Sequence, residues 1–284
     1  MPSLGPWKIG RVHLADAVDA LRQVPDASLD LIATDPPYGS TQNEWDKPVS
    51  WPSFFPEAWR VLRPAAPIVA LVDFRTACAM RAAAPDEFRY EIVCPHNLPT
   101  GHLNAKIRPM VAHLFLVVLC SETPPWFPQM EFDPSRRNHS VGPSAPGTKR
   151  RGTTYGAEKV IRCDRSGWKY PTTVLPFRMV HARFREHASE KPVPLAEWIL
   201  RSYTEPGAVV CDPFAGSGWV ACASLRTGRR SISFDSDPTS VELANRRIAT
   251  ESERLGDVAA ATASPSQQLG LLAGLAGTKE GGAS

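Results

Sequence analysis

The sequence predicts an α/β protein built around a doubly wound, largely parallel sheet. Short apolar runs alternate with amphipathic stretches along most of the chain, which is the pattern of a parallel sheet covered by helices. Two of these runs end at an aspartate that a tight turn follows, at Asp35 and at Asp212. The 284 residues, 43% of them apolar, suffice for one large domain with an insertion or for two domains.

The first 120 residues contain most of the predicted elements. Asp16 is a suitable N-cap for the first helix. Residues 39–50 are polar and turn-rich, so we expect a mobile loop over a site there. The helix predicted next has a buried stripe of Phe54, Ala58, Val61 and Leu62. We expect strands at 9–14, 29–34, 67–72, 88–93 and 111–119, and helices at 16–21, 51–63 and 75–84.

The periodic pattern stops at about residue 121, and prolines punctuate the chain that follows. Residues 134–170 contain nine Lys or Arg residues and two acidic ones, a net charge of +7, whereas the whole chain carries only +3. Aromatic residues are interleaved with these charges. A nucleic-acid surface and a solvated loop are both consistent with this composition. The candidate DNA-binding residues are Arg136, Arg137, Lys149, Arg150 and Arg151.

A compact, regular unit follows the insertion. A glycine-bearing turn at 212–218 separates a strand from a helix, and the next strand ends at Asp235. Asp237 is suited to cap the last helix, with Pro238 at its first position. Residues 251–284 are rich in Ala, Gly and Ser, so we expect a mostly disordered tail. We expect strands at 208–211 and 231–234, and helices at 195–203, 219–225 and from 238 onward.

The glycine turn indicates a nucleotide site of the adenosine type. Its glycines allow a close approach of the backbone, and the helix start presents free N–H groups to a ligand. Asp235 stands 19 residues after Gly216, near the spacing at which an acid meets ribose hydroxyls. Gly216-x-Gly218-x-x-Ala221 also matches the dinucleotide fingerprint, so an NAD-type oxidoreductase competes as an interpretation.

The corner Asp35-Pro36-Pro37-Tyr38 indicates a site for a planar group that bears an NH₂. Its prolines fix the backbone, which leaves a carboxylate, carbonyl oxygens and an aromatic ring together at a strand end. If the strands that end at Asp35 and Asp212 are neighbours, both acids reach one crevice at a switch point of the sheet. Hydride transfer has no use for such an acceptor corner, whereas methyl transfer to an exocyclic amine does.

Several classes of protein are disfavoured by composition. The six cysteines show no CxxC pair and no metal-ligand spacing, so buried thiols in a reducing, cytoplasmic setting are expected. The histidines show no ligand spacing either, and we expect no metal. No apolar run approaches a membrane span, and the start of the chain has no signal-peptide pattern.

These motifs together resemble the DNA amino-methyltransferases (N6-adenine or N4-cytosine) of permuted order, in which the catalytic motif precedes the motif for S-adenosylmethionine (SAM). Asp35-Pro36-Pro37-Tyr38 matches the catalytic motif, and residues 212–218 match the SAM loop. His187-Ala188-Ser189-Glu190-Lys191-Pro192 is similar to a stretch that adjoins the SAM pocket in that family. Residues 39–46 and 101–109 resemble segments of its phage and restriction-type members, so the resemblance covers roughly residues 8–250.

The resemblance implies a Rossmann-like methyltransferase sheet with a loop-rich recognition insertion. It divides the chain into a catalytic half (1–120), a target-recognition insertion (121–180), a SAM-binding half (181–250) and a tail (251–284). The implied catalytic residues are Asp35, Pro36, Pro37 and Tyr38, with Tyr38 as the stack for a flipped base. The implied cofactor-binding residues are Asp16, Lys191, Asp212, Phe214, Ala215, Gly216, Ser217, Gly218 and Asp235.

Simpler roles compete at three of these positions. Asp16 fits equally well as a plain helix cap, Lys191 as a solvated lysine, and Ser217 as an ordinary helix-start serine. The partner implied is double-stranded DNA, and the resemblance also allows a cognate restriction endonuclease and a homodimer. Adenine is the favoured target because Asp opens the motif, with cytosine N4 as the alternative.

The chain departs from the family pattern at several positions. Trp219 stands where Thr is usual, Ser189-Glu190 replaces Thr-Gln, Leu114 replaces Glu, and Asp235 replaces Glu. The bulk of Trp219 would either narrow the SAM pocket or pack away from it. A weakly active DNA-binding relative is therefore a third interpretation.

Overall fold

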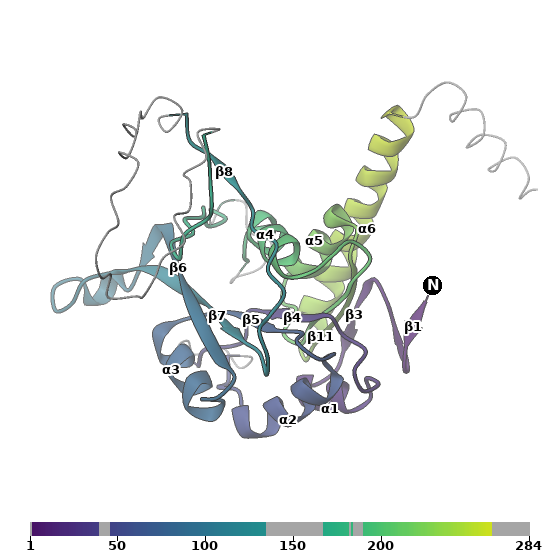
Figure 1. The fold of residues 1–284 in the computed structure, drawn as a ribbon, viewed down its shortest axis with the longest axis horizontal. Coiled ribbons are helices and arrows are strands. Elements are labelled where there is room, and N and C mark those ends of the chain that lie inside the picture. The colour runs from purple at the N-terminus through teal and green to yellow at the C-terminus, as the bar shows by residue number, and fades with distance from the viewer. Residues whose placement is uncertain (1, 40–45, 135–166, 182, 184–189, 263–284) are drawn as a thin grey trace, which may run out of the picture. The chain divides into compact units, whose positions relative to one another are not determined.

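The computed structural model describes residues 2–39, 46–134, 167–181, 183 and 190–262. Seven strands form one sheet in the order β3-β11-β10-β4-β5-β7-β6 (Figure 1). The strands are β3 (Arg11–Leu14), β4 (Leu31–Thr34), β5 (Ile68–Val72), β6 (Phe88–Thr100), β7 (Val111–Leu119), β10 (Val209–Asp212) and β11 (Arg230–Asp235). The helices are α1 (Ala17–Arg22), α2 (Trp51–Val61), α3 (Phe74–Ala83), η1 (His102–Asn104), α4 (Val193–Tyr203), α5 (Trp219–Thr227) and α6 (Pro238–Thr262).

The sheet is mixed but mostly parallel, so the predicted fold class is confirmed. β3, β11, β10, β4 and β5 run parallel to one another. β7 runs antiparallel between β5 and β6. β6 is the edge strand of this sheet, a position at which strand prolines are tolerated. Residues 173–177 bridge to its outer side, where the Pro95 carbonyl oxygen accepts from the Phe177 N at 3.0 Å.

Helices cover both faces of the sheet, and the strands supply alternate side chains to the two layers. Ile32 of β4 packs in the core with α1 and α2, whereas its neighbours Leu31 and Ala33 pack in the core with α4, α5 and α6. Figure 1 shows α1, α2 and α3 on one side of the sheet and α4, α5 and α6 on the other. Strands buried on both faces explain why these runs are continuously apolar in the sequence.

The two strands that end at the predicted acids are neighbours. β10 pairs with β4 in parallel, with Cys211 opposite Ile32. The segments that carry the two main motifs, far apart in sequence, therefore meet at the same edge of the sheet. This adjacency was the condition on which the sequence argument for a joint site depended.

The structure corrects two of the expected elements and adds another. Residues 251–262 continue helix α6 and are not part of a disordered tail. β6 extends to Thr100, well beyond the predicted end at 93, because it pairs with β7 almost to the tip of their hairpin. A short antiparallel hairpin of β1 (Ser3–Leu4) and β2 (Trp7–Lys8) precedes β3 and was not predicted.

The chain divides into two compact units, residues 1–127 with 173–284 and residues 128–172. In the second unit, β8 (Glu131–Phe132) pairs antiparallel with β9 (Trp168–Lys169), and Lys169 forms an ion pair with Glu131 at 3.0 Å. Within the described residues, no helix has both the length and the apolar character that a membrane crossing requires.

Candidate active site

An aspartate stands at or just after the carboxyl end of each of the five parallel strands. Parallel strands end at the same edge of a sheet, so these carboxylates form a row along it. Four of the five, all except Asp212, line a cavity that is described below, and they come from strands on both sides of β10. In the order of the strands across the sheet, the five are Asp16 after β3, Asp235 of β11, Asp212 of β10, Asp35 after β4 and Asp73 after β5.

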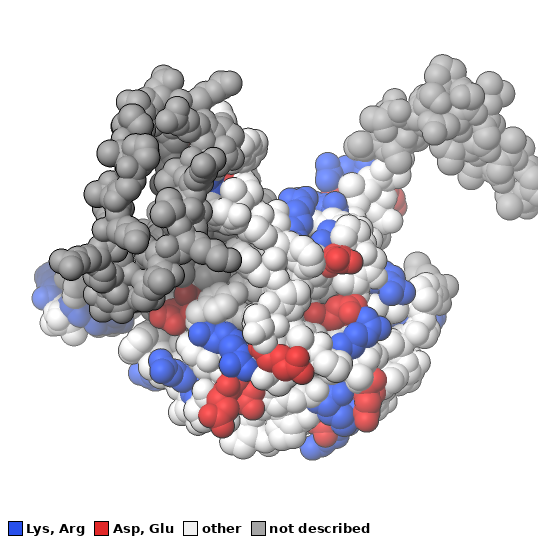
Figure 2. Space-filling model, in the orientation of Figure 1, with Lys and Arg blue, Asp and Glu red and all other residues white. Residues whose placement is uncertain are grey.

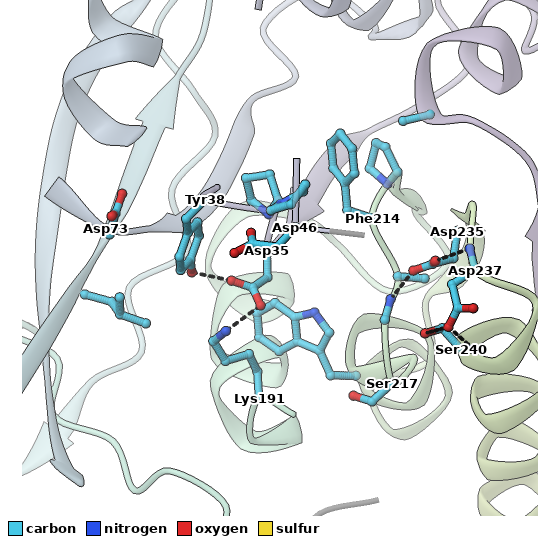
Figure 3. Close-up of a pocket in the computed structure, with 18 of the residues that line it drawn as sticks. Asp35, Tyr38, Asp46, Asp73, Lys191, Phe214, Ser217, Asp235, Asp237 and Ser240 are labelled. Carbon is cyan, nitrogen blue, oxygen red and sulfur yellow. Dashed lines mark hydrogen bonds and ion pairs between the residues drawn. The ribbon is translucent and has the colours of Figure 1, made fainter. Parts of the chain in front are cut away.

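A cavity of about 500 Å³ opens at this edge and joins the two predicted motifs. The corner from Asp35 to Tyr38 forms one part of its wall, and the turn from Pro213 to Ser217 forms another. Asp235 and Asp237 complete the wall beside the turn (Figure 3). A single ligand site thus draws on both halves of the chain.

Asp35 is held by two side chains from different parts of the chain. The Tyr38 hydroxyl donates to its Oδ1 and the Lys191 Nζ donates to its Oδ2, both at 2.5 Å (Figure 3). The side chains of Lys191 and Asp35 are only 6% and 11% exposed. An ion pair this deeply buried depends on both partners, because removal of one leaves an uncompensated charge.

Tyr38 lines the cavity, and its hydroxyl proton is engaged within the protein. Besides Asp35, the carbonyl oxygen of Leu71 lies within hydrogen-bond reach at 3.0 Å. Burial and then the charge of Asp35 raise the pKa of the Tyr38 phenol well above its ordinary value, so it stays protonated. The Lys191 Nζ lies over the ring, 5.6 Å from its centre. A base stacked on Tyr38 would therefore use the other face of the ring.

Lys191 lies at the predicted catalytic corner, although the sequence suggested that it would lie near the cofactor. It precedes helix α4, whose N-cap is Pro192, and reaches Asp35 across 156 positions of sequence. It is not a solvated lysine, because its side chain is buried. Sequence spacing carries no signal for such a contact.

Asp235 braces the glycine turn. Its Oδ2 accepts from the Gly216 N at 2.8 Å, and its Oδ1 accepts from the Asp237 N at 2.9 Å. The carboxylate also lines the cavity beside the turn. Phe214, Ala215 and Ser217 also line the cavity, as the sequence predicted for this turn.

Asp212 does not reach the cavity, contrary to the sequence-based expectation. It is fully buried, and its Oδ1 accepts from the Thr34 hydroxyl at 2.7 Å and from the Phe214 N at 3.2 Å. Among the described residues its Oδ2 has no hydrogen-bond partner. Burial raises the pKa of Asp212 to about 7, although the bonds from Thr34 and Phe214 oppose the shift. This residue ties β10 to β4.

Replacing Asp212 with asparagine is expected to remove a pH dependence of stability. The pKa of Asp212 is about 7 in the folded state and 3.8 ordinarily, so the folded state holds the proton of this carboxyl more tightly than the unfolded chain. This proton binding stabilises the fold fully below pH 4, and the stabilisation is lost as pH rises to 7. Between pH 4 and 8 the stability of the native chain should fall by up to about 4 kcal/mol relative to the variant. Urea unfolding of both proteins across this range measures it, and a constant difference would contradict the assignment.

Gly218 likewise lies behind the cavity wall. It caps α5 with a φ of +75°, and a Cβ there would lie 2.9 Å from the Cβ of Ala244 on α6. This glycine is needed for the close approach of two helices. The structure therefore accounts for its presence without a ligand contact.

Gly218→Ala and Gly228→Ala form a matched pair at the two ends of α5. Both glycines have a left-handed φ, but a Cβ at Gly228 would meet nothing within 4 Å. Gly228→Ala should therefore lower the free energy of unfolding by only about 1 kcal/mol, from backbone strain. Gly218→Ala should lower it by about 3 kcal/mol, because α6 must also shift. If urea unfolding shows that both variants lose the same free energy of unfolding, the contact with Ala244 does not contribute to stability.

Of the remaining predicted residues, Asp16 both stabilises a helix and lines the cavity. Asp16 caps α1, where its carboxylate accepts from the Val18 N and the Asp19 N, and it also lines the cavity. Trp219 is 2% exposed, belongs to the core that contains α4 and α5, and also lines the cavity. The predicted DNA-binding residues Arg136, Arg137, Lys149, Arg150 and Arg151, like residues 40–45 of the expected mobile loop, lie outside the described residues.

Asp73, Asp46 and His96 are among the lining residues that the sequence analysis did not predict as site residues. Asp73 follows β5 and caps α3, and the same strand-end rule that singled out Asp35 would have found it. Asp46 is 7% exposed and accepts from the Gly39 N at 2.8 Å, which no sequence pattern indicates. His96 comes from β6, and burial, followed by the charges of His113 and Lys191, lowers its pKa.

Solved structures with a similar fold include several DNA methyltransferases. The PvuII DNA methyltransferase, described as cytosine-N4-specific, superposes with a TM-score of 0.57 at 18% identity, over 89% of this chain and 96% of its own. The M1.HpyAVI–SAM complex gives 0.55 at 19% identity, over 84% and 98%. TTHA0409 from Thermus thermophilus, named as a DNA modification methylase, gives 0.54 at 21%, over 85% and 95%. The fold is similar to that of SAM-dependent DNA methyltransferases.

Sequence comparison adds a narrower match. Residues 148–246 match the N6/N4 methyltransferase family model, described as DNA methylase. YubD of Escherichia coli (strain K12), named as a methylase, is 41% identical over 69 residues. That match spans 24% of this chain and about a quarter (26%) of the relative's length.

Proposed function

We propose that this protein transfers a methyl group from SAM to the exocyclic amine of a DNA base, with adenine N6 as the favoured acceptor. The observation that carries the proposal is the single cavity that joins the Asp35–Tyr38 corner to the Gly216 turn. One wall suits a planar amine, and the other suits an adenosine-type cofactor. Either motif alone would be weak support.

The residues of the glycine turn fit SAM. Phe214, Gly216 and Ser217 line the cavity beside Asp235, the acid that the sequence spacing assigns to the ribose hydroxyls. The lining also carries six aspartates and one lysine, and a negative field of this kind favours a cationic ligand. When bound, SAM supplies an electrophilic methyl group on a positively charged sulfur.

The corner residues would prepare the amine for attack. The lone pair of an exocyclic amine is delocalised into the base, so the nitrogen must be drawn toward a tetrahedral geometry. Asp35 and the Pro36 carbonyl would each accept one N–H, and Lys191 and Tyr38 would hold the carboxylate in position. As the nitrogen takes the methyl group that bound SAM would supply, Asp35 would accept the proton that the nitrogen loses, directly or through water.

A base in a duplex cannot reach a cavity at the sheet edge without leaving the stack. The proposal therefore includes base flipping, with double-stranded DNA as the partner. Adenine is favoured over cytosine because Asp35 opens the motif in place of Ser. A cognate restriction endonuclease and a second copy of the chain stay predictions from the resemblance.

Nucleoside mass spectrometry tests the proposal directly. The full chain is incubated with unmethylated, PCR-amplified DNA and isotope-labelled SAM, and the digested nucleosides are separated. We expect labelled N6-methyladenine. Labelled N4-methylcytosine would overturn the choice of base, and absence of label from all nucleosides would overturn the activity. Calorimetric titration with SAM and NAD then separates a weakly active relative from an oxidoreductase.

A further inference from the structure

The hairpin between β6 and β7 carries an exposed apolar tip, which we define as residues 102–110. All nine residues of the tip are exposed, and Leu103 and Ile107 have 90% and 81% of their surface in solvent. Met110, 45% exposed, adds a third apolar side chain. In Figure 1 the hairpin projects beyond the other strands, at the left of the view.

The tip is an ordered turn. Gly101 adopts a φ of +83°, and the Asn104 N donates to its carbonyl oxygen at 2.9 Å. The Ile107 N and the Arg108 N both donate to the Asn104 carbonyl oxygen at 3.0 Å. The backbone thus fixes two large apolar residues in water, where each forgoes roughly 1.5–3 kcal/mol of burial. A binding partner would recover that free energy.

Charge indicates the kind of partner. The sequence contains no Asp or Glu between Glu91 and Glu122, whereas the tip contains Lys106, Arg108 and His102. Figure 2 shows basic side chains at the end of the hairpin. This combination suits double-stranded DNA, because basic side chains can contact its phosphates while apolar side chains insert between its stacked bases.

The stem of the same hairpin lines the candidate active site. Leu98 and Thr100 of β6, with Val111 and Leu114 of β7, form part of the cavity wall. Thr100 and Val111 are paired residues that directly flank the tip and its glycine. The tip therefore adjoins the part of the cavity wall that the hairpin forms.

We propose that the tip is a DNA wedge: Leu103 and Ile107 enter the base stack beside the target, while Lys106 and Arg108 contact the flanking phosphates. The inference rests on the proposed function. Unstacking a base step costs a few kcal/mol, and apolar side chains that fill the vacated space offset that cost. In the sequence, the tip precedes the basic insertion that the sequence analysis singled out for DNA contacts.

The test compares paired and unpaired forms of the same DNA. Leu103→Ser combined with Ile107→Ser should lower methyl transfer to PCR-amplified duplex at least about tenfold, yet transfer to the heat-denatured DNA by less than about twofold, because only the duplex must be unstacked. The matched control, Leu103→Met with Ile107→Leu, keeps the apolar bulk and should retain duplex transfer within about twofold. Unchanged transfer, or equal loss on both forms, would overturn the wedge.

Binding tests the charged part without any need for catalysis. Lys106→Ala with Arg108→Ala should weaken binding of a fluorescein-labelled duplex and reduce its salt slope by about 2. If the native chain methylates no DNA, the proposed activity fails, and anisotropy with these variants and the serine pair still decides whether the tip binds a duplex. Unchanged affinity and salt slope in all variants would overturn the DNA contact.

Discussion

Asp35→Ala is expected to lower methyl transfer roughly a thousandfold, while SAM still binds. The carboxylate is the acceptor that would draw the amine nitrogen out of conjugation, and no neighbouring residue of the corner supplies another carboxylate there. The glycine turn, on the other wall, is not touched by the change. Single-turnover transfer to DNA measures the first effect, and calorimetry with SAM measures the second.

Two outcomes would contradict this role for Asp35. Near-native transfer in the variant would remove the carboxylate from the mechanism. Loss of SAM binding together with transfer would mean that the variant has lost the cavity as a whole. Asp35→Asn refines the test, because its Oδ1 can still accept one N–H while the negative charge is gone.

Lys191→Met is expected to lower the free energy of unfolding by about 3 kcal/mol, because it leaves the Asp35 carboxylate buried without its cation. The two side chains are 6% and 11% exposed, so solvent compensates little of the loss. Urea unfolding of the native chain and the variant measures the difference. Methionine preserves the length and apolar stem of lysine, so little of the expected loss comes from packing.

The double variant Asp35→Ala with Lys191→Met separates structure from chemistry. It removes both charges, so it should be more stable than the sum of the single losses predicts, by about 1–3 kcal/mol. It should nevertheless transfer no methyl group, because the acceptor is missing. Additive losses in stability would show that the ion pair contributes nothing beyond its separate members.

Local patterns predicted most of the elements and the two walls of the site. Apolar runs located the parallel strands, because strands buried on both faces have no polar alternation. The predicted caps Asp16 and Asp237 are both observed, since capping depends on a few adjacent residues. The end of α6 and the length of β6 were misjudged, because these depend on partners elsewhere in the chain.

The sequence by itself determined the order of the elements, the acid-ended strands and the chemistry at each strand end, because these properties reside in neighbouring residues. Only the tertiary structure decided which strand ends meet and what each acid does there. Asp35 faces the cavity and pairs with Lys191, whereas Asp212, of the same type and at a neighbouring strand end, is buried against Thr34. Burial and long-range partners, which no local pattern encodes, make one carboxylate a candidate for catalysis and the other a tie within the sheet.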